Sequence, residues 1–331
     1  MNERRNPMAM ARARHALLQA GLDSTVSLEP ASSVTNEVWL TPTHVVRVNR
    51  RPNQRLRREA ILGPSLPDEI GYPMVVAYGG RMGADYLVLK RIEGKPLAHW
   101  WPSMEPTQRR EAVRQLAAKL RRLHHTPGPA DLPAIDAPQM LRDETLSPVM
   151  SLLVALDQAR SLAHVDRGLI DDVERMVFDL TPSIEPFVSE FLVHGDLTFE
   201  NVLWNGERIT AILDFEWART APADVDLDVF LRMCCLPQLH VGDDLVPHTR
   251  PADYADIPWW LREDYPELFD VPRQFDRLRL YAIAYDIRDL TMFPPPAPAS
   301  RLNEHHSLNR LRRTIVGNSH LDRLDAGAST L

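Results

Sequence analysis

Three polar residues in the second half of the chain could hold a metal ion. Asp196 ends the tripeptide His-Gly-Asp, Asn201 follows five residues later, and Asp214 begins the tripeptide Asp-Phe-Glu. Carboxylate and carboxamide oxygens are hard ligands, and hard cations such as Mg²⁺ prefer them to nitrogen or sulfur. These residue types therefore indicate a magnesium site, provided that the fold brings them together.

A predicted β-hairpin over residues 202–213 is the element that could do so. Two short apolar runs flank an Asn-Gly pair in this segment. Asn-Gly between β-rich runs is a strong local signal for a hairpin turn. Because a hairpin returns the chain to the end where it started, we expect Asp196, Asn201 and Asp214 to converge at one rim.

This order of motifs resembles the catalytic core of the aminoglycoside phosphotransferase and choline kinase family, which are small-molecule relatives of protein kinases. In protein kinases a catalytic loop with Asp and Asn is followed by Asp-Phe-Gly. The resemblance implies that Asp196 orients the acceptor hydroxyl or accepts its proton. It also implies that Asn201 and Asp214 hold Mg²⁺ against the nucleotide phosphates.

Two further residues would support the catalytic loop if the resemblance holds. His194 shapes the turn before Asp196. A carboxylate downstream should bind the loop backbone, and Asp226, followed by leucine, matches the family pattern best. Asp224 and Asp228 are alternatives in register.

The resemblance implies an α+β, protein-kinase-like fold with two lobes. We expect an N-terminal nucleotide-binding lobe over residues 1–92, with an antiparallel sheet, and a larger, mainly helical catalytic and acceptor-binding lobe over residues 93–331. The sequence pattern agrees, since β-branched runs dominate the first part and helical periodicity the second. The expected strands cover 26–28, 37–40, 44–48, 72–77 and 86–89, and the expected helices cover 8–20, 53–62, a segment from 106, 141–163, 169–180, 274–292 and 301–316.

Arg47 lies where protein kinases carry a phosphate-binding lysine. The resemblance implies that Arg47 contacts phosphate, which a guanidinium can do in bidentate fashion. It also implies that Glu59, on the following helix, pairs with Arg47. From the residues alone, Arg47 could instead be a solvent-facing strand residue, and Glu59 a surface residue among arginines.

Residues 30–36 correspond to the loop that covers the nucleotide phosphates in the family. The hydroxyls of Ser32 and Ser33, together with backbone amides, could bind phosphate oxygens. The loop lacks the Gly-x-Gly-x-x-Gly of protein kinases. Its alternative interpretation is an ordinary hairpin turn.

The composition narrows the class of partner. The chain has 331 residues, 44% of them hydrophobic, and a formal charge of −7. This charge offers no basic field for nucleic acid. A mildly acidic surface would attract a cationic acceptor, although a modest charge can also serve solubility alone.

The same composition bears on location. No segment approaches the roughly 20 apolar residues that a membrane span needs, and the N-terminus lacks the apolar core of a secretory signal. The two cysteines, Cys234 and Cys235, are adjacent, so no disulfide framework can form. We therefore expect a cytoplasmic protein without membrane or nucleic-acid partners, whose oligomeric state the sequence does not predict.

The sequence thus predicts an ATP- and Mg²⁺-dependent kinase acting on a hydroxyl of a small molecule, with GTP as the alternative nucleotide. Candidate acceptors are an aminoglycoside or other antibiotic, an amino alcohol or a sugar. The irregular segment 236–272, with Trp259 and Trp260, is the expected place of acceptor recognition. The alternative is a nucleotide-binding pseudoenzyme with a regulatory role. A protein kinase and a metal-dependent phosphohydrolase are less favoured, because their motifs are missing.

Overall fold

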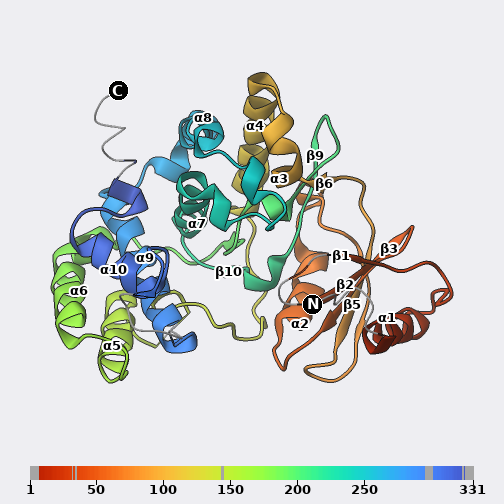
Figure 1. The fold of residues 1–331 in the computed structure, drawn as a ribbon, viewed down its shortest axis with the longest axis horizontal. Coiled ribbons are helices and arrows are strands. Elements are labelled where there is room, and N and C mark those ends of the chain that lie inside the picture. Colours follow the sequence, from red (N-terminus) through yellow and green to blue (C-terminus); the bar gives the residue numbers. More distant parts are fainter. Residues whose placement is uncertain are drawn as a thin grey trace. The chain divides into compact units, whose positions relative to one another are not determined.

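The structure is a computed structural model that describes residues 7–31, 33, 36–142, 145–294, 301–322 and 324. The chain forms two compact units (Figure 1). The first comprises Met1–Ile135 and Phe199–Arg219, and the second Asp136–Thr198 and Thr220–Leu331. The proposed division of roles at residue 92 stays a prediction.

The first unit contains an antiparallel five-stranded sheet in the order β1-β2-β3-β5-β4. Its strands are β1 (Glu29–Ala31), β2 (Asn36–Leu40), β3 (His44–Asn49), β4 (Val75–Gly79) and β5 (Tyr86–Lys90). The prediction was wrong for the first strand, which was expected at 26–28. Pro30 lowers the β propensity of this segment, but β1 is an edge strand, where a missing backbone donor is tolerated.

Helices cover both faces of this sheet. Successive side chains of β3 point to opposite faces, so Val46 and Val48 pack against α1 (Pro7–Gln19). Val45, on the other face, packs against Leu56 of α2 (Arg55–Leu62). The alternation places Arg47 on the α2 face, together with Val45.

The predicted hairpin is present in the first unit. Strands β8 (Val202–Trp204) and β9 (Ile209–Ile212) are antiparallel neighbours. Their turn is closed by the amide of Asn205, which donates to the carbonyl of Arg208 at 3.2 Å. A third strand, β6 (Lys95–Pro96), pairs with β8 and was not predicted, because two residues carry no periodicity. The unit also contains α3 (Leu97–Trp100) and α4 (Pro106–Leu123).

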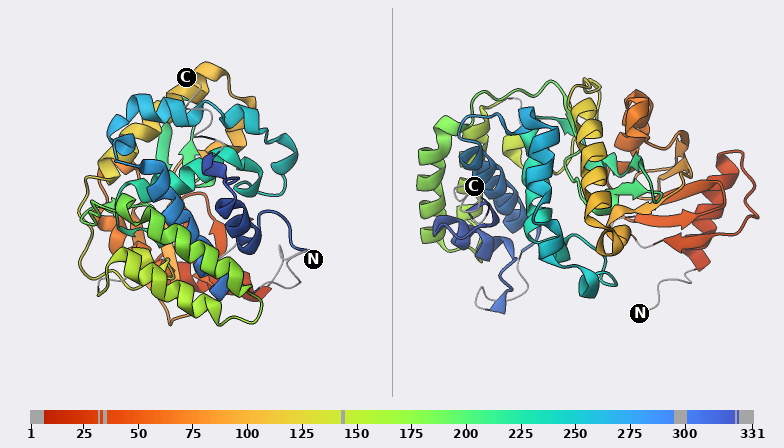
Figure 2. Two further views of the ribbon diagram at one scale, coloured as in Figure 1. Left: turned by 90° about the vertical axis from the view of Figure 1, so that its left-hand side faces the viewer. Right: turned by 90° about the horizontal axis from the view of Figure 1, so that it is seen from above.

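The second unit is mainly helical, as Figures 1 and 2 show. It contains α5 (Pro148–Arg160), α6 (Arg167–Leu180), α7 (Asp224–Cys235), α8 (Ile257–Asp264), α9 (Gln274–Met292) and α10 (Ser307–Ile315), with the short strand β7 (Leu192–Val193). The chain passes from the first unit to the second within strand β10 (Arg219–Thr220), which has one residue in each. Among the described residues, no helix is long and apolar enough to cross a membrane.

The second unit differs from the prediction in three places, one of which is α10, since it begins at Ser307 and not at 301. Helix α5 begins at Pro148 and not near 141, because Ser147 caps it by accepting a hydrogen bond from the amide of Met150. The segment 236–272 was expected to be irregular throughout, yet it contains α8. Pro258 lies in the first turn of α8, where proline is tolerated.

Candidate active site

Arg47 is the centre of a cluster of charges in the first unit. The residue is only 9% exposed. One terminal nitrogen, Nη1, pairs with Glu59, and the other, Nη2, contacts Asp214 at 2.9 Å and Glu216 at 3.3 Å. The solvent-facing alternative for Arg47 is therefore wrong, and so is the surface alternative for Glu59, which is fully buried.

Three elements bring these side chains together. Strand β3 carries Arg47 in the middle of the sheet, and α2 carries Glu59 one turn after Leu56, which is buried against the same face. The hairpin returns the chain to its start, since the amide of Leu213 donates to the carbonyl of Asn201 at 2.8 Å. Asp214 follows directly and so reaches Arg47.

The backbone of Asp214 is in an uncommon conformation. Its φ of 63° and ψ of 57° lie in the left-handed region, which Asp and Asn adopt more readily than other non-glycine residues. Residues held in this region cluster at active sites. The conformation therefore marks Asp214 as a functional candidate independently of its motif.

The electrostatics of the cluster keep Arg47 charged. Burial would lower the pKa of Arg47, but its three carboxylate neighbours outweigh burial and raise that pKa above the ordinary value. Burial raises the pKa of Glu59, against the lowering effect of Arg47. A fixed, permanently charged guanidinium of this kind is suited to bind an anion such as a phosphate group.

Glu216 has more partners than the sequence suggested. It is 2% exposed. Its Oε1 accepts from Arg55 at 3.1 Å, and its Oε2 accepts from Asn36 at 3.4 Å as well as from Arg47. The guanidinium of Arg55 lies 4.4 Å from the ring centroid of Trp217. In the sequence, Glu216 is the third residue of Asp-Phe-Glu, and no pattern there relates it to Asn36 or Arg55.

The phosphate-loop serines are described only in part. Ser32 lies outside the described residues. The hydroxyl of Ser33 accepts a hydrogen bond from the amide of Asn36 at 3.4 Å, which ties the loop to the first residue of β2. The role of both serines in phosphate binding stays a prediction.

Asn201 and Asp214 have the chemistry of a magnesium site. Asp214 pairs with Arg47 through Oδ1, and its side chain is 34% exposed, so the carboxylate is accessible from solvent. Within the described part of the chain, no group of three or more His, Cys, Asp or Glu side chains is arranged to hold a metal. Mg²⁺ commonly uses one or two protein carboxylates together with substrate phosphates, and the donor set here fits that mode.

The catalytic-loop residues belong to the second unit. The carboxylate of Asp226 is 1% exposed and accepts from the amides of His194 and Gly195, both at 2.7 Å. Gly195 has a φ of 80°, a conformation that favours glycine. His194 is buried, whereas Asp196 is exposed. A buried carboxylate thus holds the turn that presents Asp196.

The two alternatives to Asp226 have other partners. Asp224 accepts from Arg277 at 2.6 Å and from Tyr281 at 3.2 Å. Asp228 lies 3.5 Å from Arg232 on the same helix. Of the three aspartates, Asp226 is therefore the one whose hydrogen bonds reach the loop backbone.

Replacing Asp226 by asparagine should lower both stability and transfer rate. An amide oxygen can accept from only one of the two amides, which leaves a buried N–H unsatisfied, so we expect a loss of about 2–4 kcal/mol in the free energy of unfolding. Urea denaturation measures this loss, and the transfer rate should fall as well because the turn before Asp196 loosens.

Asp228→Asn is the matched control, because Asp228 is equally buried on the same helix. It should cost stability without slowing transfer by the folded protein. Equal transfer rates for the Asp226 and Asp228 variants would contradict a specific role of Asp226.

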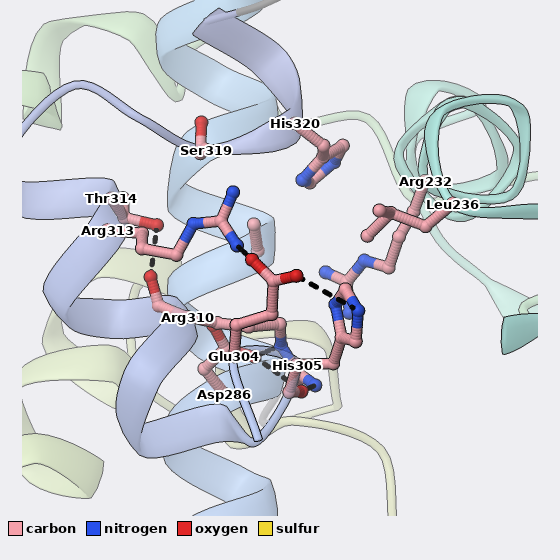
Figure 3. Close-up of a pocket in the computed structure, with 11 residues that line it drawn as sticks. Arg232, Leu236, Asp286, Glu304, His305, Arg310, Arg313, Thr314, Ser319 and His320 are labelled. Atoms are coloured by element: carbon pink, nitrogen blue, oxygen red, sulfur yellow. Dashed lines mark hydrogen bonds and ion pairs between the residues drawn. The ribbon is translucent and has the colours of Figure 1, made fainter. Parts of the chain in front are cut away.

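The acidic residues of α9 are engaged in ion pairs. Asp286 is 2% exposed and accepts from Arg310 at 2.7 Å, and Asp289 accepts from Arg310 at 3.2 Å. The cavity beside them, shown in Figure 3, also contains the ion pair of Glu304 with Arg313. Its volume of about 30 Å³ accommodates water but not a sugar. These contacts favour a structural role for Asp286.

The predicted convergence of Asp196 with Asn201 and Asp214 stays a prediction. Asp196 belongs to the second unit, and Asn201 and Asp214 belong to the first. Within the first unit, the structure joins Arg47, Glu59 and Asp214 in one cluster.

Comparison with known proteins identifies the family. The model of the phosphotransferase enzyme family matches residues 27–241, well over half of the chain. The chain belongs to this family. The matched range includes Arg47, Glu59, Asp196 and Asp214, so the phosphotransferase match covers every part of the candidate site. No curated protein matches this phosphotransferase.

Solved structures of similar fold are aminoglycoside phosphotransferases. ADP-bound APH(2'')-Ib is 15% identical, with a TM-score of 0.61 over 92% of this chain and 97% of that one. APH(2")-IIa in a ternary complex with streptomycin and ATP is 15% identical, with a TM-score of 0.60 over 93% and 96%. A thermostable mutant of APH(4)-Ia with ADP and hygromycin B is 14% identical, with a TM-score of 0.59 over 95% and 99%. These likenesses confirm the predicted α+β, protein-kinase-like two-lobe fold of this phosphotransferase.

Proposed function

We propose that the chain transfers the γ-phosphate of ATP to a hydroxyl group of a small molecule, with Mg²⁺ as the metal ion. The observation that carries this proposal is the buried Arg47, held by Glu59 and Asp214. In kinases a cation on the same strand contacts the phosphates and pairs with a helix glutamate. The family match supports phosphoryl transfer as the reaction. GTP is the alternative nucleotide.

The proposed roles in the first unit follow from charge and chemistry. Arg47 contacts the phosphates and Glu59 keeps the guanidinium in place, while Ser33, together with Ser32, adds hydrogen bonds from the loop. Asn201 and Asp214 would hold Mg²⁺. When bound, the ion neutralises the charge of the phosphate oxygens and aligns them for in-line transfer.

The proposed roles in the second unit concern the acceptor. Asp196 orients the acceptor hydroxyl and accepts its proton, which is the work of a general base. Its exposed side chain is accessible to such a hydroxyl. Asp226 fixes the amides of His194 and Gly195, so the turn before Asp196 keeps one shape.

The acceptor is proposed from charge and from the similar structures. Two of those structures contain aminoglycosides, namely streptomycin and hygromycin B. The formal charge of −7 would favour a cationic acceptor of this kind. We therefore propose an aminoglycoside first, and then another antibiotic, an amino alcohol or a sugar. The division of roles between residues 1–92 and 93–331, and a cytoplasmic location, belong to the same proposal.

A coupled ADP-release assay over aminoglycosides, macrolides, choline-like amines and sugars tests the function. Release that requires both an acceptor and Mg²⁺, and that stops on addition of EDTA, is the expected result. Repeating the assay with GTP identifies the nucleotide. Nucleotide binding without ADP release for any acceptor would favour a nucleotide-binding pseudoenzyme with a regulatory role. A lack of nucleotide binding would contradict both the kinase and the pseudoenzyme.

A further inference from the structure

Two residues of the site depart together from the protein-kinase pattern. Kinases have lysine on the strand where this chain has Arg47, and glycine after Asp-Phe where it has Glu216. The structure places the two departures in contact, with 3.3 Å between Nη2 of Arg47 and Oε2 of Glu216. Both side chains are buried, so the contact is shielded from water and salt.

The geometry of the contact depends on a guanidinium. Nη1 of Arg47 pairs with Glu59, while Nη2 is shared between Asp214 and Glu216. A lysine has a single terminal nitrogen, a compact point charge without this fork. It could pair with Glu59, as the lysine of kinases pairs with its helix glutamate, but it has no second terminal nitrogen to extend toward Glu216.

Glu216 is fixed from its other side as well. Its Oε1 accepts from Arg55, which stacks on Trp217, and its Oε2 also accepts from Asn36. Asn36 is the first residue of β2 and the last residue of the loop assigned to the phosphates. Glu216 therefore connects the cation on β3 with the end of that loop.

We infer that Arg47 and Glu216 are a matched pair, in which Glu216 is a positioning residue for the phosphate-binding guanidinium; this inference rests on the proposed function. Asp214 has two tasks in that proposal, since it contacts Arg47 and would also bind Mg²⁺. Glu216 is the carboxylate that keeps Nη2 in place while Asp214 serves the metal. An arginine on β3 needs this third carboxylate, whereas a lysine does not.

A double-mutant cycle tests the pair with wild type, Arg47→Lys, Glu216→Gln and the double variant. Glutamine keeps the shape of Glu216, so all four proteins should fold. We expect each single change to weaken Mg·ATP binding about tenfold. If the two sites were independent, the loss of affinity in the double variant would be the product of the two single losses. We expect a loss at least about fivefold smaller than that product, because the two side chains belong to one network. If the loss of affinity in the double variant were within twofold of the product of the two single losses, the inference would be overturned.

Arg57→Lys is the matched control for Arg47→Lys. Arg57 is an exposed arginine on α2 whose guanidinium donates to Gln54. When Arg57→Lys is combined with Glu216→Gln, the loss of Mg·ATP affinity should equal the product of the losses of the two single variants. Coupling as large as that of the Arg47 cycle would show a general effect of charge and would also overturn the inference.

Two further measurements separate positioning from stability and from the proposed function. Glu216→Gln should raise the KM for nucleotide more than it lowers kcat; an unchanged KM would reduce Glu216 to a structural residue. The same cycle in urea, without nucleotide, reports whether the two side chains are coupled in the free protein. If wild type binds no nucleotide, the proposed function fails, and the urea cycle still decides whether the pair is matched.

Discussion

Asp196→Ala is expected to slow phosphoryl transfer by about 10²–10⁴-fold, the usual contribution of a general base, while the affinity for nucleotide stays near that of wild type. The reason is that the proposed task of Asp196 concerns the acceptor hydroxyl and not the phosphates. Because the side chain is exposed, its removal should change the free energy of unfolding by less than about 0.5 kcal/mol. Single-turnover ADP formation with a saturating acceptor measures the expected loss directly.

Asp179→Ala is the matched control, since Asp179 is an exposed aspartate on α6 in the same unit. It should transfer phosphate at the wild-type rate. Asp196→Asn should be as slow as Asp196→Ala, because an amide cannot accept a proton at neutral pH. Full activity in either Asp196 variant would remove the residue from the mechanism.

Local signals were sufficient for the hairpin and most of the sheet. The Asn-Gly pair and its flanking apolar runs predicted β8 and β9, which the structure contains. Alternation in β3 placed Val46 and Val48 on one face, and this leaves Arg47 on the other. The sequence could not decide whether that other face was exposed to solvent or buried in the core. The answer depends on α2, whose Leu56 packs there in one cluster with Leu87 of β5.

The connections of Glu216 could not be predicted from the sequence. Its partners Asn36 and Arg55 lie 180 and 161 residues away along the chain. No periodicity or spacing relates such positions, and only tertiary packing brings them together. The motif drew attention to Glu216, but a carboxylate next to Asp-Phe could equally have been a surface charge.

The acceptor remains a proposal for a related physical reason. The segment expected to recognise it contains α8, whose buried residues Ile257 and Leu261 are four positions apart on one face of the helix. Trp259 on the same helix is 53% exposed, so its ring can stack on a ligand. The types of exposed side chains depend on the ligand that they bind and not on the packing of the fold. Their pattern in the sequence therefore does not predict the acceptor.

Asp214→Asn is expected to abolish the dependence of nucleotide binding on Mg²⁺. The affinity for ATP measured with Mg²⁺ should fall by at least about 10–100-fold. This is the loss seen when a residue that only hydrogen-bonds to a metal ligand is replaced, and a ligand itself should matter at least as much. Asparagine is the suitable replacement because it tolerates the left-handed backbone at this position. Alanine there would add about 1–2 kcal/mol of backbone strain and confuse a folding defect with a lost ligand.

Calorimetric titration of ATP with Mg²⁺ and with EDTA distinguishes the two tasks of Asp214. Wild type should bind far more weakly in EDTA, whereas the variant should bind with the same low affinity in both. Asp68→Asn, an exposed aspartate of the same unit, should behave as wild type. If Asp214→Asn kept a full Mg²⁺ response, Asp214 would only be a partner of Arg47, and the metal ligands would have to be sought elsewhere. If it lost affinity equally with and without Mg²⁺, the ion pair with Arg47 would be its main contribution, because that pair is present without metal.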